Sequence, residues 1–252
     1  SAEKRTALIT RLLQRKEYAQ YWAMKWADIL RVDKEIIKPV GTIAMTRWLT
    51  DQFANNLPYD QFVRKIVTAQ GNTLSESPAA FYLVHNNPEK LVRSVSQVFL
   101  GVRIECAQCH HHPFEVWGQD DFYSFAAYFA KVGRKGTGLS PPISGSEEII
   151  FTASSGSVKH PLTGKTLQPR PLLGKVAEVN KDEDPRAALA RWITADDNPF
   201  FAKVMVNRVW ADLMGRGLVE PVDDLRATNP PTNPELLAAL AVDFQKADFD
   251  IK

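Results

Sequence analysis

Residues 97–130 have the sequence QVFLGVRIECAQCHHHPFEVWGQDDFYSFAAYFA, and this stretch decides how the fold is interpreted. It places the two cysteines of the chain, Cys106 and Cys109, between two segments whose apolar residues recur at helical spacing. Residues 88–100 carry the first of these patterns, and residues 118–132 carry the second. The sequence therefore predicts two helices that flank a compact turn holding both cysteines.

The same helical spacing recurs over most of the chain. Further helices are expected at residues 3–32 (as a pair joined near Lys16), 45–53, 58–69, 184–195, 198–214 and 234–246. Between them, residues 133–180 are rich in glycine, proline and serine and contain short β-like runs. We therefore expect a mainly α fold with a helical domain at 1–132, a loop-rich insert with a small β-ribbon at 133–180, and a second helical segment at 181–252.

Composition limits the class of protein. The 252 residues are 44% hydrophobic, which is enough for a substantial buried core. The formal charge is +2 without any basic block, so nucleic-acid binding is not expected. No apolar run approaches the roughly 20 residues that span a bilayer, and the first residues lack the apolar stretch of a signal peptide. Because helical patterns run close to both ends, we expect this sequence to be a piece of a longer chain.

The motif CAQCH at residues 106–110 is typical of c-type haem attachment. Two thiols at this spacing form thioether bonds to the two vinyl groups of one haem, and the adjacent histidine becomes an axial ligand of the iron. We therefore expect one covalent haem c, bound through Cys106 and Cys109, with His110 as the axial iron ligand.

Two other chemistries stay open for these cysteines. In a zinc site, the two thiolates and His112 would be joined by one distant histidine, His85 or His160. Structural zinc sites usually draw their ligands from two short-spaced pairs, and a second pair is missing here. A redox CxxC usually follows a strand in a βαβ unit, whereas this one follows a predicted helix. Haem is therefore favoured, with zinc as the alternative cofactor.

The opposite axial position of the iron needs a ligand from elsewhere in the chain, because His111 and His112 are too close in sequence to His110 to reach it. The candidates are His85, His160, Met205 and Met45, or a bound water. Each has an ordinary structural alternative, such as core packing for a methionine in an apolar helix.

Side chains directly after the motif are candidates for contact with the haem. We expect His112 to hydrogen-bond a propionate or a bound water, with an exposed loop position as the alternative. Trp117 and Tyr123 are expected along the haem edge, and Phe122 and Phe125 are further candidates. Core packing is the alternative for all four aromatic residues.

Two stretches resemble known families. Residues 97–130, quoted above, are similar to a domain of unknown function found in large secreted proteins of Planctomycetes that also carry cytochrome c domains. Residues 191–240, RWITADDNPFFAKVMVNRVWADLMGRGLVEPVDDLRATNPPTNPELLAAL, are similar to its usual partner, the planctomycete surface domain. The resemblance implies export, since c-type haem is attached outside the cytoplasm, and further modules on the parent chain. It implies no reaction, and His111 stands where the family commonly has an acidic or small residue.

The paired carboxylates of Asp223 and Asp224 allow two interpretations. Together with backbone carbonyls they suit a calcium ion, although their spacing matches no known calcium loop. We favour a structural role in which Arg208 and Arg216 pair with these carboxylates and hold residues 220–234, expected to be extended, against the preceding helix.

Three functions are considered for such a chain. The first is electron transfer or redox sensing, with a redox partner protein that the sequence does not identify. The second is an enzyme with an open iron site and peroxide-type chemistry, in which a distal histidine or arginine assists. The third is a surface-binding module in which haem or zinc is structural. A periplasmic or cell-surface location is expected.

Overall fold

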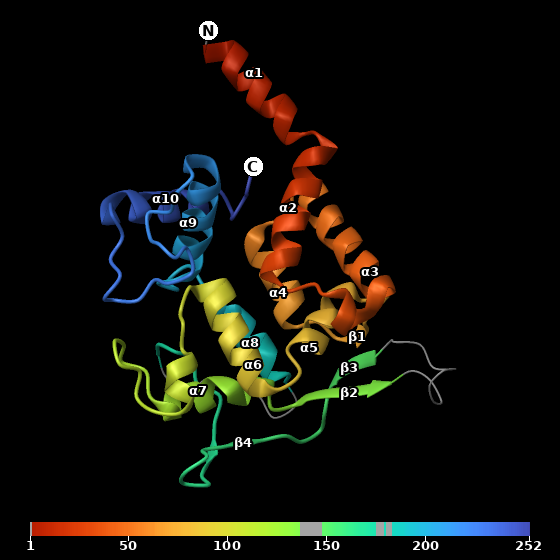
Figure 1. The fold of residues 1–252 in the computed structure, drawn as a ribbon, viewed down its shortest axis with the longest axis vertical. Helices are drawn as coiled ribbons and strands as arrows, with labels where there is room; N and C mark the ends of the chain where they lie inside the picture. Colours follow the sequence, from red (N-terminus) through yellow and green to blue (C-terminus); the bar gives the residue numbers. More distant parts are fainter. Residues whose placement is uncertain (1, 137–147, 175–178, 180–182) are drawn as a thin grey trace. The chain divides into compact units, whose positions relative to one another are not determined.

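A computed structural model of the chain describes residues 2–136, 148–174, 179 and 183–252. The predicted mainly α fold is confirmed, with helices predominating and short strands between them (Figure 1). Contacts group the chain into two compact units. The first comprises Ser1–Val84, Lys135–Ile150 and Asp250–Lys252, and the second comprises His85–Arg134 and Phe151–Phe249. Across the described residues, no helix combines the length and the apolar character needed to cross a membrane.

The first unit is built from helices that pack around aromatic side chains. Its helices are α1 (Ala2–Leu13), α2 (Lys16–Ile29), α3 (Lys34–Ala54), α4 (Tyr59–Val67), η1 (Ser77–Ala80) and α5 (Phe81–Val84). α2 and α3 lie side by side (Figure 1). In the core, the rings of Trp26 and Phe62 meet edge to face with centroids 5.0 Å apart. α3 begins earlier than predicted and bends where Lys38, with φ of 62°, precedes Pro39.

The second unit contains the helices on either side of the cysteine motif and those of the last third of the chain. Its helices are α6 (Pro88–Val95), η2 (Ser96–Leu100), η3 (Glu105–Gln108), α7 (Gln119–Ala126), η4 (Ala127–Phe129), α8 (Pro185–Ile193), α9 (Phe201–Met214) and α10 (Pro234–Lys246). α6 contacts α7, and α9 lies against α10 (Figure 1). The two helices predicted around the motif are therefore present, and Phe122 and Phe125 of α7 are fully buried.

The strands are short and pair in antiparallel fashion. β1 (Gly71–Asn72), β2 (Val132–Gly136) and β3 (Glu148–Thr152) form a sheet in the order β1-β3-β2, with Gly71 opposite Ile150. β4 (Val158–Lys159) pairs with β5 (Thr166–Leu167), so that Val158 faces Leu167. The predicted β-ribbon is confirmed by these strands, while residues 137–147, 175–178 and 180–182 of that region and its border lie outside the described residues.

The start of α9 differs by two residues from the prediction. For the helix predicted over residues 198–214, the sequence favours Asn198 as the cap and Pro199 in the first turn, but the helix begins at Phe201. Asn198 still caps it, since its Oδ1 accepts hydrogen bonds from the backbone N–H groups of Phe200 (3.0 Å) and Phe201 (3.1 Å). These are the two amides that a cap at Asn198 is expected to accept from, so the capping bonds are present although the regular helix begins two residues later.

A buried ion pair holds the start of α8. Asp184 accepts a hydrogen bond from the backbone N–H of Arg186 (3.0 Å), and its Oδ2 lies 2.7 Å from the guanidinium of the same residue. Thr152 donates to Asp184 Oδ2 at 2.9 Å. Burial acts to raise the pKa of Asp184, but the hydrogen bonds and charge of Arg186 outweigh it and lower the pKa. This polar cluster is therefore paired throughout and serves the fold.

The loop after α9 is held by one fully buried side chain, Asn207. Its Nδ2 donates to the carbonyls of Val219 (2.9 Å) and Val222 (3.2 Å), and its Oδ1 accepts from the N–H of Val219 (3.0 Å). A Cβ at Gly217 would lie 2.5 Å from the carbonyl oxygen of Val219 and 3.2 Å from both terminal atoms of Asn207, so glycine permits this close approach. The stretch predicted to be extended is thus a loop folded back onto α9.

Candidate functional site

The chain reaches the cysteine motif through a sharp change of direction at Gly101. α6 continues into η2, a wider π-type turn, and Gly101 then takes the left-handed conformation with φ of 65°. A Cβ at this position would lie 3.0 Å from Cγ of Leu225 and 3.1 Å from Cγ2 of Val204. Glycine is therefore required both by the backbone angle and by the close packing, and it ends the helical segment that the sequence predicts over residues 88–100.

The motif itself forms a short 3₁₀ turn with both thiols accessible. η3 covers Glu105–Gln108, and the N–H groups of Cys109 and His110 both point to the carbonyl of Cys106, at 3.2 and 3.3 Å. Side chains three residues apart in a 3₁₀ turn lie nearly above one another, so the two cysteines share one face. Both are exposed and free, whereas Ala107 between them is fully buried. The turn is thus anchored by Ala107 and presents the sulfur atoms to solvent.

The hydrogen bonding of His110 leaves one ring nitrogen available. Nδ1 lies 2.6 Å from the carbonyl oxygen of His111, and a carbonyl only accepts, so Nδ1 carries the proton. The lone pair is then on Nε2 of an exposed imidazole. A backbone carbonyl on Nδ1 is a common way to orient a histidine that binds metal through Nε2.

Two of the other histidines carry the opposite tautomer. His112 Nδ1 accepts from the N–H of Phe114 at 3.2 Å. His160 Nδ1 accepts from the N–H groups of Leu162 (3.2 Å) and Thr163 (3.3 Å). In the neutral form both rings therefore carry their proton on Nε2. His110 differs from them in offering a lone pair there.

Neighbouring helices fix the position of the motif turn. The carbonyl of Gln108 accepts hydrogen bonds from Gln119 Nε2 (3.0 Å) and from the hydroxyl of Tyr123 (3.4 Å). Burial raises the pKa of Tyr123, so its hydroxyl stays protonated and donates. On the other side, Arg93 of α6 forms an ion pair of 2.7 Å with Glu105. Tyr123, predicted along a haem edge, is therefore in contact with the motif backbone.

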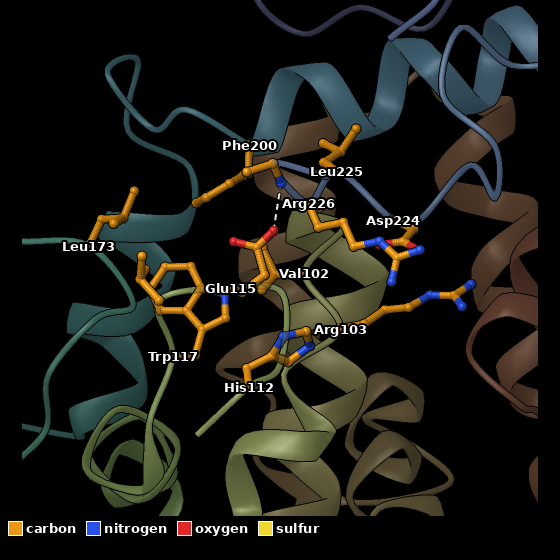
Figure 2. A pocket seen from close by; sticks show the side chains of 12 residues that line it. Val102, Arg103, His112, Glu115, Trp117, Leu173, Phe200, Asp224, Leu225 and Arg226 are labelled. Carbon is orange, nitrogen blue, oxygen red and sulfur yellow. Dashed lines mark hydrogen bonds and ion pairs between the residues drawn. The ribbon is translucent and has the colours of Figure 1, made fainter. Parts of the chain in front are cut away.

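His112 and Trp117, also predicted near the cofactor, both line a pocket of about 290 Å³ in the second unit (Figure 2). The N–H of His112 donates to the carbonyl of Trp117 at 2.8 Å, which closes the loop between them. Trp117 is 5% exposed. Its Nε1 has no hydrogen-bond partner among the described residues. Cys106, Cys109 and His110 are not among the residues that line this pocket.

The proposed ligands for the opposite axial position lie at different places. His85 is buried at the start of the second unit, with Nε2 3.1 Å from the hydroxyl of Ser94. His160 is buried beside Tyr123, with ring centroids 6.1 Å apart, and its Nε2 is 3.7 Å from Asp120. Met205 is buried within α9, and Met45 is buried within α3 of the first unit. Of these four, His160 contacts a residue that itself touches the motif.

The predicted partners of Asp223 and Asp224 were wrong. Asp223 pairs with Arg103 at 2.5 Å and accepts from Gln97 at 2.8 Å. Asp224 is paired with Arg226, at 3.5 Å.

Arg208, expected to hold one of these carboxylates, instead donates to the carbonyl of Val98 at 2.5 Å, and Arg216 is exposed. The reason is the folded loop after α9, which carries both aspartates to the segment before the motif. That segment is further tied by the N–H of Leu225, which donates to the carbonyl of Gly101 at 2.8 Å.

The zinc alternative finds no assembled ligand set. Within the part of the chain that the structure describes, no group of three or more histidine, cysteine, aspartate or glutamate side chains is arranged to hold a metal ion. His85 and His160 instead take part in the hydrogen bonds described above. The same finding gives no support to a calcium site at Asp223 and Asp224.

Comparison with known proteins identifies two family matches. Residues 185–252 match PSD1, described as protein of unknown function DUF1553. Residues 1–134, which include the motif, match PSCyt2, described as protein of unknown function DUF1549. These names resemble those of planctomycete cytochrome-c-type domains. No curated protein and no solved structure matches the chain. Because the PSCyt2 match covers more than half of the sequence, the chain belongs to the family described as protein of unknown function DUF1549.

Proposed function

We propose that Cys106 and Cys109 attach one haem c through thioether bonds and that Nε2 of His110 binds its iron. The observation that carries this proposal is the 2.6 Å contact between His110 Nδ1 and the carbonyl of His111, which leaves the Nε2 lone pair available. On this basis the chain is an electron-transfer or redox module.

The residues present suit this cofactor. Two free, exposed thiols on one short turn supply the sulfur atoms that thioether bonds require. The histidine beside the second thiol has the tautomer that an iron ligand needs, unlike His112 and His160. Cys106, Cys109 and His110 would therefore supply the two thioether sulfurs and one nitrogen ligand for a haem c.

When bound, the haem supplies a one-electron oxidation and reduction at iron. The chain's own residues hold the ligand in place. Gln119 and Tyr123 fix the carbonyl of Gln108, and the ion pair of Arg93 with Glu105 fixes the start of the turn. These contacts would hold His110 in one place and so would suit a cofactor that supplies electron transfer.

Export and a larger parent protein are part of the same proposal. Haem is joined to CxxCH motifs outside the cytoplasm, so a periplasmic or cell-surface location follows from the attachment. A redox protein of the same compartment is the partner that this function requires.

The test is to produce the whole chain with an export signal in a host that matures cytochromes c. The intact mass of the denatured protein is expected to exceed the polypeptide mass by one haem, and reduction is expected to sharpen the α and β absorption bands. Replacing both cysteines, Cys106→Ser with Cys109→Ser, is expected to remove the added mass completely.

A matched pair of histidine variants assigns the axial ligand. His110→Ala is expected to change the spectrum of the attached haem, whereas His111→Ala, the exposed neighbour, is expected to leave it unchanged. A low-spin spectrum indicates a filled opposite site, and a high-spin spectrum indicates the open site of a peroxide-type enzyme. Polypeptide mass alone, without a Soret band, in material from the competent host would overturn the haem proposal and direct zinc analysis to the same cysteines.

A further inference from the structure

A second site is indicated by the pocket that His112 and Trp117 share in the second unit (Figure 2). Its volume of about 290 Å³ is just below the range, roughly 300–1,000 Å³, that ligand pockets cover. The lining comes from the loop after the motif, from Arg103 before it, and from residues 224–227. The two cysteines and His110 do not line the pocket, although His112 follows His110 by two residues.

Two buried polar atoms at this pocket lack partners. Nε1 of Trp117 and Oδ1 of Asp224 have no hydrogen-bond partner among the described residues, although the side chains are only 5% and 2% exposed. Buried polar atoms in folded proteins nearly always have a partner. Figure 2 shows the indole nitrogen on the side of Trp117 that faces Glu115. One atom is a donor and the other an acceptor, so a ligand that completes both must accept and donate hydrogen bonds.

The charges at the pocket balance. Arg103 and Arg226 are opposed by Glu115 and Asp224. Arg103 is already paired with Asp223, and Glu115 Oε1 accepts from the N–H of Ala227 at 2.5 Å. Neither an anion nor a cation gains from a lining that is neutral in sum, because each would face an opposing charge as well as a matching one. The lining therefore favours a neutral ligand.

The remaining walls are apolar. Val102, Leu173, Phe200 and Leu225 lie around the same cavity as the indole of Trp117. A ligand that suits them needs an apolar face as well as polar groups at its edge. A pyranose ring has this character, since one face presents C–H groups and its rim presents hydroxyls that both donate and accept.

We propose that this pocket binds a monosaccharide unit, either free or at the end of a glycan. Both atoms are covered in the structure, so side-chain rotations of the kind that commonly accompany binding must first turn them toward the cavity. One ring hydroxyl then accepts from Trp117 Nε1, and another donates to Asp224 Oδ1. The Nε2–H of His112 supplies a further donor at the rim, because its Nδ1 is occupied by the N–H of Phe114. The proposal goes beyond haem attachment and does not depend on it.

Isothermal titration calorimetry with the whole chain tests this site. The probes are the methyl glycosides of glucose, galactose and mannose, each at millimolar concentration, with benzoate as an anionic ring of similar size. At least one glycoside is expected to bind saturably, and benzoate is not. Trp117→Phe keeps the aromatic ring but removes the donor, and is expected to weaken binding roughly tenfold. Asp224→Asn is expected to weaken it roughly fivefold.

Trp192→Phe is the matched control, because Trp192 lies in the same unit, packs on Phe125 and does not line the pocket. It is expected to leave the affinity unchanged, and thermal melting checks that every variant is folded. Equal affinity for the glycoside with and without attached haem would show that the pocket binds its ligand whether or not the haem proposal holds. Absence of binding by all three glycosides, unchanged affinity in both pocket variants, or binding of benzoate alone would each overturn the monosaccharide proposal. A disaccharide that binds more tightly than its terminal methyl glycoside would identify a glycan end.

Discussion

The cysteine turn and the loop after α9 are both rich in polar atoms, but they use them in opposite ways. Asn207 is fully buried, and its amide serves three backbone groups of the loop. In the turn, both thiols and the ring of His110 are exposed, and Nε2 keeps a lone pair. Polar atoms that are buried and paired hold a fold together, whereas exposed atoms with spare bonding capacity are suited to chemistry. The pocket at Trp117 is intermediate, since two polar atoms of its lining residues, Trp117 Nε1 and Asp224 Oδ1, are buried without a hydrogen-bond partner among the described residues.

The largest effect is expected on the structural side of this comparison. Asn207→Ala removes the partners of Val219 and Val222 and should lower the free energy of unfolding by about 4 kcal/mol, because each unpaired buried group costs about 1–3 kcal/mol. Urea unfolding of the purified chain measures it. Asn229→Ala is the control: Asn229 donates to two loop carbonyls but is partly exposed, so about 1 kcal/mol is expected. Equal losses in the two variants would contradict the assigned role of burial.

A smaller and pH-dependent effect is expected at the start of α8. Asp184→Asn keeps the cap but leaves Arg186 without its charge partner, and should cost about 2 kcal/mol at pH 7. The pKa of Asp184 is lowered in the folded state from its ordinary 3.8, so the stabilisation is present above that value and is lost as the pH falls below it.

The measurement is the difference in unfolding free energy between wild type and Asp184→Asn at pH 7, 4 and 3. The difference should shrink below about pH 4. Asp197→Asn, an exposed carboxylate in the same unit, should show almost no difference at any of these pH values. If the difference in unfolding free energy between wild type and Asp184→Asn stayed constant down to pH 3, the charge of Asp184 would not be what stabilises α8.

The smallest stability effect is expected at the motif. In protein without haem, Cys106→Ser together with Cys109→Ser should change the unfolding free energy by less than about 0.5 kcal/mol, because both side chains are exposed. Ala107→Leu in the same turn should cost about 1–3 kcal/mol, since Ala107 is fully buried. Thermal melting of the two proteins makes the comparison. A large loss in the serine variant would give the thiols a structural role that their exposure does not indicate.

Local signals in the sequence were sufficient for most helices. Asn87 and Asn233 cap α6 and α10 as their positions before a proline indicate, and Gly215 ends α9 in the left-handed conformation. The start of α3 was missed because Pro39 interrupts the apolar spacing there. Helix periodicity and caps depend on neighbours a few residues apart, which is why one sequence reveals them.

The motif was found because its residues are contiguous, and the pocket was missed because its residues are not. Arg103 and Leu225 line the same cavity although more than a hundred residues separate them. The same limit explains the wrong partner for Asp223. Arg208 and Arg216, from the preceding helix and its end, were chosen, whereas the folded loop brings Arg103 to Asp223. Buried and unpaired atoms such as Trp117 Nε1 have no signature in a sequence.

Residues 97–115 and 208–227 are joined by hydrogen bonds and an ion pair, and these contacts have a consequence for how such chains are inherited. The N–H of Leu225 donates a hydrogen bond to the carbonyl of Gly101, and the N–H of Ala227 donates to the carboxylate of Glu115. A segment of the PSCyt2 match and a segment of the PSD1 match therefore belong to one compact unit. A recombination that exchanged only the second match would separate surfaces that were shaped together. The two domains should therefore occur together in the same proteins. A chimaera should fold only when the motif segment and the loop after α9 come from the same parent.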